Sequence, residues 1–179
     1  MRGGSEASVR PRVVVSQCLE LAAVRYDGAS IRAPIVRELA SSVELVPVCP
    51  EVGIGLGVPR DPIRLVRLGD GMRLRQPATG RDLTGVMRAF AADFLARVGP
   101  VDGFLLKSRS PSCGIGDVKL HAALDDDAVV ATTSGMFAAA VLETYPGLPT
   151  EDEEGLTDPV RRRRWLDAVF GHAGRRPTG

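Results

Sequence analysis

Three cysteines are the side chains of this sequence whose type and spacing best suit chemistry. Cys18, Cys49 and Cys113 are the only cysteines among the 179 residues, and they lie 31 and 64 residues apart along the chain. An odd number of widely spaced thiols does not indicate a disulfide framework. Thiolates are soft ligands that suit both zinc and iron–sulfur clusters, so three of them in one place would form a metal site. For a single cysteine, the ordinary alternative is a small buried core residue.

Each cysteine follows a short apolar run that is typical of a β-strand. The runs stand in the segments RVVVSQC, ELVPVC and VDGFLLKSRSPSC, each of which ends at a cysteine. Aliphatic runs of this length favour strands that are buried on both faces, as in parallel sheets. Two stretches between the runs predict helices, at about 33–41 and 84–98. The second carries apolar residues at helical spacing, namely Met87, Phe90, Ala91, Phe94 and Leu95.

This alternation of strands and helices predicts an α/β fold with a mostly parallel sheet. The loops that follow parallel strands converge at the carboxyl edge of the sheet, so the three cysteines are expected to meet there. Zinc and an iron–sulfur cluster both stay open as the bound group. The sequence has no C-x-x-C pair, and His121 and His172 lack the spacing of zinc ligands. A cubane cluster normally takes four cysteine thiolates, so three would leave one iron open as a Lewis acid for a sulfur atom.

Composition limits the protein class. Apolar residues make up 44% of the chain, charged residues 25%, and the formal net charge is +1. These values are typical of one soluble globular domain. No segment approaches the roughly 18 consecutive apolar residues of a membrane span, and the N-terminus has no apolar signal region. We therefore expect a cytoplasmic protein with no membrane partner.

Charge is unevenly distributed along the chain. Residues 121–154 contain eight acids and no Lys or Arg, whereas residues 156–179 contain six Arg and two Asp. A charged run is usually a solvated face, although clustered arginines also bind the phosphates of a polyanion such as tRNA. Only 4% of residues are aromatic, which disfavours a non-catalytic tRNA-binding module because bases need stacking partners. That module stays one alternative, and a zinc-dependent hydrolase on the same cysteines is the other.

Three blocks around the cysteines resemble the thiouracil desulfidase family. They are VSQCLELAAVRYDG (15–28), PVCPEVGIGLGVPR (47–60) and LKSRSPSCG (106–114). The segment at 135–159 is similar to longer members, related to desulfidases that convert 4-thiouridine in tRNA to uridine. In those members a second domain that helps engage tRNA follows, and here only the cluster domain is expected. The resemblance covers about residues 12–170.

The resemblance implies a Rossmann-like three-layer α/β domain at 12–170, between a disordered segment at 1–11 and a flexible tail at 171–179. It also implies an oxygen-sensitive 4Fe–4S cluster on Cys18, Cys49 and Cys113. The open iron would take the sulfur of a thiolated uracil, giving uracil or uridine and sulfide by non-redox hydrolysis. Thiouracil, thiouridine and thiolated tRNA are the candidate substrates.

Further site residues follow from the motif match and from the chemistry. By resemblance, Glu51 is the general acid/base, and either Ser110 or Ser108 assists at the substrate. Addition of water to a thiocarbonyl carbon requires a base, which gives a carboxylate next to the cluster a role. The remaining candidates would bind the substrate: Lys107, Ser112, Arg60, Arg25 and Tyr26. The alternative to substrate binding is an internal ion pair for Arg25 and Arg60, and an ordinary surface charge for Lys107.

Overall fold

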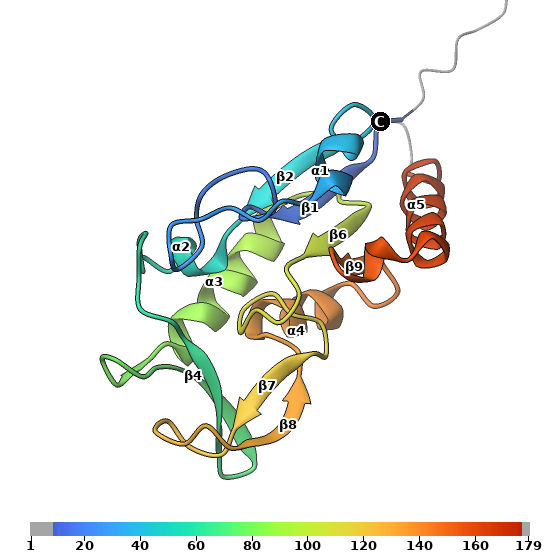
Figure 1. Cartoon of the computed structure of the whole chain (residues 1–179). Coiled ribbons are helices and arrows are strands. Elements are labelled where there is room, and N and C mark those ends of the chain that lie inside the picture. Colours follow the sequence, from blue (N-terminus) through green and yellow to red (C-terminus); the bar gives the residue numbers. More distant parts are fainter. Residues whose placement is uncertain (1–8, 177–179) are drawn as a thin grey trace, which may run out of the picture.

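A parallel four-stranded sheet forms the centre of the computed structural model, which describes residues 9–176 (Figure 1). Its strands lie in the order β2 (Glu44–Val48), β1 (Arg12–Ser16), β6 (Gly103–Leu106) and β9 (Thr150–Asp152). All three pairs of neighbouring strands are parallel. The predicted parallel α/β architecture is therefore confirmed, and β1, the strand that precedes Cys18, lies inside the sheet.

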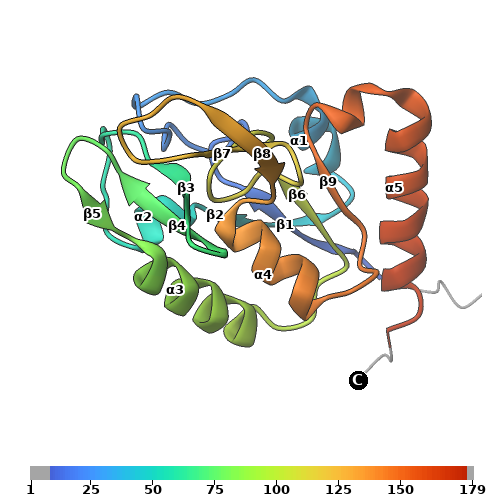
Figure 2. The ribbon, with the colours of Figure 1, turned by 90° about the horizontal axis from the view of Figure 1, so that it is seen from below.

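Helices cover both faces of this sheet and make three layers (Figure 2). One face packs against α1 (Pro34–Leu39) and α5 (Pro159–Ala173), and the other against α3 (Thr84–Arg97) and α4 (Met136–Thr144). Successive side chains of a strand point to opposite faces, and β1 follows this rule. Val13 and Val15 pack with the α1 and α5 side chains, whereas Val14 packs with those of α3 and α4. Because both faces are covered, β1 is apolar on both, as its sequence predicted.

A second sheet was not anticipated from the sequence. It has the order β5 (Arg81–Asp82), β4 (Gly71–Gln76), β3 (Arg64–Leu68), β7 (Val118–His121) and β8 (Val129–Thr133). Its pairs are antiparallel except for β3 with β7. The tight turn between β3 and β4 contains Gly69 at a φ of 57°, a conformation that glycine adopts without steric cost. The expected mostly parallel sheet thus describes the first sheet only.

The predicted helices form close to their expected bounds. The helix expected at 84–98 is α3, and it buries Thr84, Met87, Ala91 and Leu95 on one face. The helix expected at 33–41 is the shorter α1. Helix α5 extends to Ala173, so the expectation of a flexible tail from residue 171 is wrong for its first three residues, because Ala173 packs as a buried residue. Arg176 in the same tail pairs with a buried carboxylate, and the parts of the two expectations at residues 1–8 and 177–179 lie outside the described residues. Within residues 9–176, no helix combines the length and the apolar character that crossing a membrane requires.

The carboxylate of Asp102 ties α5 to the amino end of the parallel sheet. Asp102 is fully buried at the start of β6. One of its oxygens accepts a hydrogen bond from the backbone N–H of Arg12 at 2.7 Å and pairs with Arg176 at 2.9 Å. Its other oxygen lies 2.9 Å from Nδ1 of His172. One buried side chain therefore connects β1, β6 and the C-terminal helix.

We expect Asp102→Ala to lower the free energy of unfolding by about 3 kcal/mol, because removing one partner leaves buried polar groups without a bond. Chemical unfolding followed by circular dichroism measures this. Asp167→Asn is the matched control, because Asp167 is 74% exposed in its ion pair with Arg163. An exposed pair of this kind contributes less than about 1 kcal/mol. Equal stability of the Asp102 variant and the wild type would contradict this assignment.

Candidate active site

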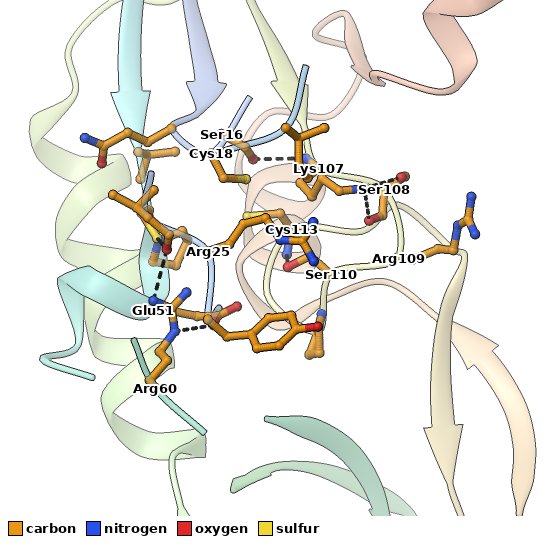
Figure 3. Close-up of a pocket in the computed structure, with 18 of the residues that line it drawn as sticks. Ser16, Cys18, Arg25, Glu51, Arg60, Lys107, Ser108, Arg109, Ser110 and Cys113 are labelled. Atoms are coloured by element: carbon orange, nitrogen blue, oxygen red, sulfur yellow. Dashed lines mark hydrogen bonds and ion pairs between the residues drawn. The ribbon is translucent and has the colours of Figure 1, made fainter. Parts of the chain in front are cut away.

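The carboxyl ends of β1, β2 and β6 bring the three cysteines to one cavity. Cys18 lies two residues after β1, Cys49 directly follows β2, and Cys113 lies in the loop after β6. All three line a cavity of about 340 Å³. Figure 3 shows Cys18 and Cys113 facing this space, with Glu51 and Arg60 across it. The convergence predicted from the strand ends is thus observed.

Local hydrogen bonds hold each cysteine in its loop. The backbone C=O of Cys18 accepts from the N–H of Ile31 at 2.7 Å, which closes the loop after β1. Cys49 precedes the first turn of the short helix α2 (Pro50–Gly53), and its thiol donates to the C=O of Val24 at 3.9 Å. The N–H of Cys113 donates to Oγ of Ser110 at 3.1 Å. Each cysteine therefore has a bond that fixes its segment, and the Cys49 thiol joins the start of α2 to the loop after β1.

Burial disfavours the thiolate form of all three cysteines. It raises the pKa of Cys18 to about 12, with a further increase from the nearby Cys49. Burial also raises the pKa of Cys49 and of Cys113. For Cys113, a hydrogen bond with Ser16 works in the opposite direction, and the other two cysteines raise its pKa further. Three mutually repelling thiolates would require a compensating cation, which is what a metal group supplies.

The carboxylate of Glu51 is held at both oxygens. Oε2 accepts from Nε of Arg60 at 2.8 Å, and Oε1 accepts from Oγ of Ser112 at 3.1 Å. Arg60 also donates to the C=O of Val24 at 3.0 Å and of Gly57 at 2.8 Å, and its side chain is only 4% exposed. Of the two alternatives for Arg60, the structure thus has the internal ion pair. Glu51 is fixed in one orientation at the cavity wall.

Ser112 does not lie where the sequence analysis expected it. Its side chain is fully buried, and Ser112 is not among the residues that line the cavity. Its hydroxyl is instead used by Glu51. The substrate-binding role expected for Ser112 is therefore replaced by a supporting contact, because the turn of the SPSC segment directs this side chain inward.

The two candidate serines, Ser110 and Ser108, have different surroundings. Oγ of Ser110 accepts from the backbone N–H of Ser112 at 3.2 Å and of Cys113 at 3.1 Å, and Ser110 lines the cavity. Ser108 also lines the cavity, but it is 2% exposed and its hydroxyl donates to Glu153 at 2.7 Å. The hydroxyl proton of Ser110 has no acceptor among the described residues, whereas that of Ser108 is already used.

The remaining predicted contacts also reach the cavity. Nζ of Lys107 donates to the C=O of Ser108 at 2.9 Å and to its Oγ at 2.7 Å, so it is not a plain surface charge. The guanidinium of Arg25 has the internal ion pair that was its alternative, with Asp27 at 3.4 Å, and it also lies 5.3 Å from the ring centre of Tyr26, whose side chain is exposed. Lys107, Arg25 and Tyr26 all line the cavity.

Two acids of the site were missed in the sequence. Glu153 binds Lys107 and Ser108, and Glu154 lines the cavity and pairs with Arg109. Both belong to the acidic run at 121–154, where only the loop after β9 turns toward the cysteines. Nothing in a run of like charges distinguishes the inward-facing members, so this signal was not available.

The first turn of helix α4 packs against the loop that carries Cys113 and donates hydrogen bonds to it. The N–H groups of Phe137 and Ala138 donate to the C=O of Ser112 at 2.9 and 3.0 Å. A Cβ at Gly135 would lie 2.5 Å from the backbone carbon of Ser112 and 2.7 Å from the backbone oxygen of Ser110. Only glycine permits this close approach of the helix to the loop.

The basic helix α5 lies apart from the cavity. Arg161 pairs with Glu151 and Arg162 with Glu38, and Arg163 lies 3.9 Å from Asp167. These three arginines of the predicted basic patch therefore have acidic partners within the described part of the chain.

Fold and site together define an α/β protein with a three-thiol centre and a fixed carboxylate. The sequence model of the 2-thiouracil desulfurase family matches residues 13–153, and the chain belongs to this family. The match contains the three cysteines and Glu51 and ends at Glu153.

Two proteins illustrate the relationship. YbbK, an uncharacterized protein of Bacillus subtilis (strain 168), is 31% identical in an alignment of length 111, which covers 58% of this chain and 74% of YbbK. The solved structure of TudS, a [4Fe-4S]-dependent thiouracil desulfidase, is similar with a TM-score of 0.64 at 27% identity. The similarity covers 87% of this chain and 99% of that of TudS.

The raised thiol pKa values predict an unusual pH dependence of cysteine alkylation in the metal-free protein. Alkylation needs the thiolate, so Cys18 in the native fold should react slowly until the pH approaches about 12. The same cysteine in guanidinium should react from about pH 8.5. The native fold binds these protons more tightly than the unfolded chain does. The stability that the neutral thiols contribute is therefore complete below the pKa of the unfolded chain and is lost as pH rises through the pKa of the folded protein.

Iodoacetamide labelling with peptide mass spectrometry measures the reaction rate at each cysteine. A native rate profile that matches the denatured one would refute the assignment.

Proposed function

We propose that this chain is a desulfidase that removes sulfur from thiolated uracil, with a 4Fe–4S cluster bound by Cys18, Cys49 and Cys113. The reaction would be a hydrolysis with no net change of redox state, giving uracil or uridine and sulfide. The observation that carries this proposal is the meeting of three thiols from separate loops at one cavity, next to a glutamate fixed at both oxygens. Membership of the 2-thiouracil desulfurase family supports it.

The donor set suits a cluster better than one zinc ion. A single zinc needs its ligands gathered at one point. Within residues 9–176, no three His, Cys, Asp or Glu side chains are close enough together to hold one metal ion. A cubane places each thiolate on a different iron, so its cysteines need only surround a common space. With three thiolates, the cluster would offer one iron without a protein ligand, which would supply a Lewis acid for the sulfur of the substrate.

Glu51 is the base that takes a proton from the water that adds to the thiocarbonyl carbon. Arg60 and Ser112 use one lone pair on each carboxylate oxygen, and each oxygen keeps another for the water. Holding the carboxylate in one orientation reduces the entropy lost on reaching the transition state. Glu51 then gives this proton to the departing sulfur as the carbon–sulfur bond breaks, and the hydroxyl proton of the adduct leaves as its oxygen becomes the carbonyl, so thiocarbonyl and water yield carbonyl, HS⁻ and H⁺.

Ser110, rather than Ser108, is the serine that contacts the substrate. Two backbone N–H groups orient its oxygen, which leaves the hydroxyl proton to be donated to the pyrimidine. Such a preorganised donor stabilises charge that develops on the ring. The exposed ring of Tyr26 and the guanidinium of Arg25 provide planar surfaces at the cavity for the pyrimidine or its sugar.

The first test is anaerobic reconstitution with iron and sulfide, followed by assays on 2-thiouracil, 4-thiouracil, 4-thiouridine and thiolated tRNA. We expect a brown protein that releases sulfide from at least one of these substrates. Alanine in place of Cys18, Cys49 or Cys113 should remove both bound iron and turnover. Glu51→Gln should keep the iron and lower kcat by about 10²-fold or more, because the base is lost.

Glu143→Gln is the matched control, because Glu143 is an exposed acid of α4 outside the cavity. If the purified protein is colourless, contains zinc and is an active hydrolase, the zinc-dependent hydrolase is the correct reading and the cluster is not. RNA binding that survives loss of all three cysteines, without turnover, would favour the binding module. No sulfide release from any of the four substrates would refute the proposed activity.

The two serines can be separated by substitution. Ser110→Ala should lower kcat by about 10²-fold with bound iron unchanged, because a preorganised donor is lost. Ser108→Ala should lower it by about 10-fold or less, because its N–H still donates to Glu153 at 2.8 Å. Steady-state kinetics on the best substrate measures both. A larger loss for the Ser108 variant would reverse the assignment.

A further inference from the structure

Glu153 accepts three hydrogen bonds at the site, and the proposed function gives it no role. Its Oε1 accepts from Nζ of Lys107 and from Oγ of Ser108, and its Oε2 accepts from the N–H of Ser108 at 2.8 Å. The side chain is only 10% exposed. It comes from the loop after β9, an element that carries none of the cysteines. A buried carboxylate with three donors is a well-satisfied and rigid group.

The contacts of Lys107 show what this carboxylate does. The ammonium group has three donors, and the structure uses them for Glu153, for the C=O of Ser108 and for its Oγ. Lys107 lines the cavity, but it has no proton left for a substrate atom. Its action on a substrate is therefore that of a fixed positive charge.

The position of this charge is close to a cysteine. The backbone N–H of Lys107 donates to Oγ of Ser16, two residues before Cys18, at 2.9 Å, and Lys107 and Cys18 line the same cavity (Figure 3). Removal of sulfur as sulfide builds negative charge at the sulfur atom. A cation that is already fixed beside that point stabilises the charge without reorganisation during the reaction.

We propose that Glu153 is a positioning residue of this site, which acts through Lys107 and Ser108. It fixes the Lys107 ammonium group at the cavity beside Cys18, and it anchors the start of the loop that carries Ser110 and Cys113. This inference rests on the proposed function for its catalytic consequence, whereas the contact itself can be tested without turnover.

Amine labelling tests the contact, because Lys107 and Lys119 are the only lysines of the chain. The side chain of Lys107 is 20% exposed and fully bonded, whereas Lys119 is an exposed residue of β7. Anaerobic acetylation of the reconstituted protein should therefore modify Lys119 well before Lys107, as measured by peptide mass spectrometry. Glu153→Gln should raise the Lys107 to Lys119 ratio by about fivefold or more, because the charged acceptor is gone.

Kinetics tests the catalytic consequence. Glu153→Gln should lower kcat by about 10-fold to 10²-fold with KM changed less than about twofold, since a transition-state interaction is weakened. Lys107→Met should lower kcat at least as much. The kcat of the variant that combines Lys107→Met with Glu153→Gln should lie within about twofold of that of Lys107→Met alone, because Glu153 acts through Lys107. Bound iron should match the wild type in every variant.

Glu151→Gln is the matched control. Glu151 lies on β9, two residues before Glu153, and its side chain is 16% exposed; it pairs with Arg161 of α5 and does not line the cavity. It should leave the labelling ratio and kcat unchanged. If Glu153→Gln does not accumulate, Glu153→Asp keeps the charge while shortening its reach and should show the same directions.

An unchanged labelling ratio in Glu153→Gln would overturn the proposed contact. An unchanged kcat, or losses that multiply in the double variant, would overturn the positioning role. If the wild type releases no sulfide from any thiolated pyrimidine, the proposed function fails, and the labelling ratio still decides whether Glu153 holds Lys107.

Discussion

Parallel pairing of β1 with β2 and with β6 is the constraint on which the site depends. The carboxyl ends of parallel strands lie at the same edge of a sheet, so the loops that leave them share one space. Cys18, Cys49 and Cys113 therefore meet although 64 residues separate the last two. The apolar side chains of β1, which are buried on both faces, hold this arrangement by packing against two layers of helices.

The cavity combines groups that are costly to bury with partners that compensate them. Burial raises the pKa of all three thiols, which favours a metal group as the cation that would stabilise the thiolates. Two partly buried charged pairs at the site are each satisfied within the protein, Glu51 by Arg60 and Glu153 by Lys107. Buried charges are tolerated when geometry and hydrogen bonds are good, and such pairs keep their side chains in one orientation.

The loop that carries Ser110 and Cys113 has support on two sides. The first turn of α4 donates backbone hydrogen bonds to Ser112, and the glycine at 135 lets that helix approach the loop. The loop after β9 holds Lys107 and Ser108 through Glu153. Residues from the last third of the chain thus determine the geometry of a site whose cysteines all come earlier.

Much of this protein could be predicted from its sequence, because local patterns carry the necessary information. Apolar runs before each cysteine predicted the parallel strands, and helical spacing at 84–98 predicted α3. The positions of the cysteines after those strands predicted that the cysteines converge.

Only the tertiary structure decided which charged side chains pair. The ion pair of Arg60 with Glu51 and the inward turn of Glu153 depend on contacts between segments far apart in sequence. The antiparallel second sheet depends likewise on which strands become neighbours. A residue type reports what a side chain can bond to, and only the folded chain determines what lies within reach of it.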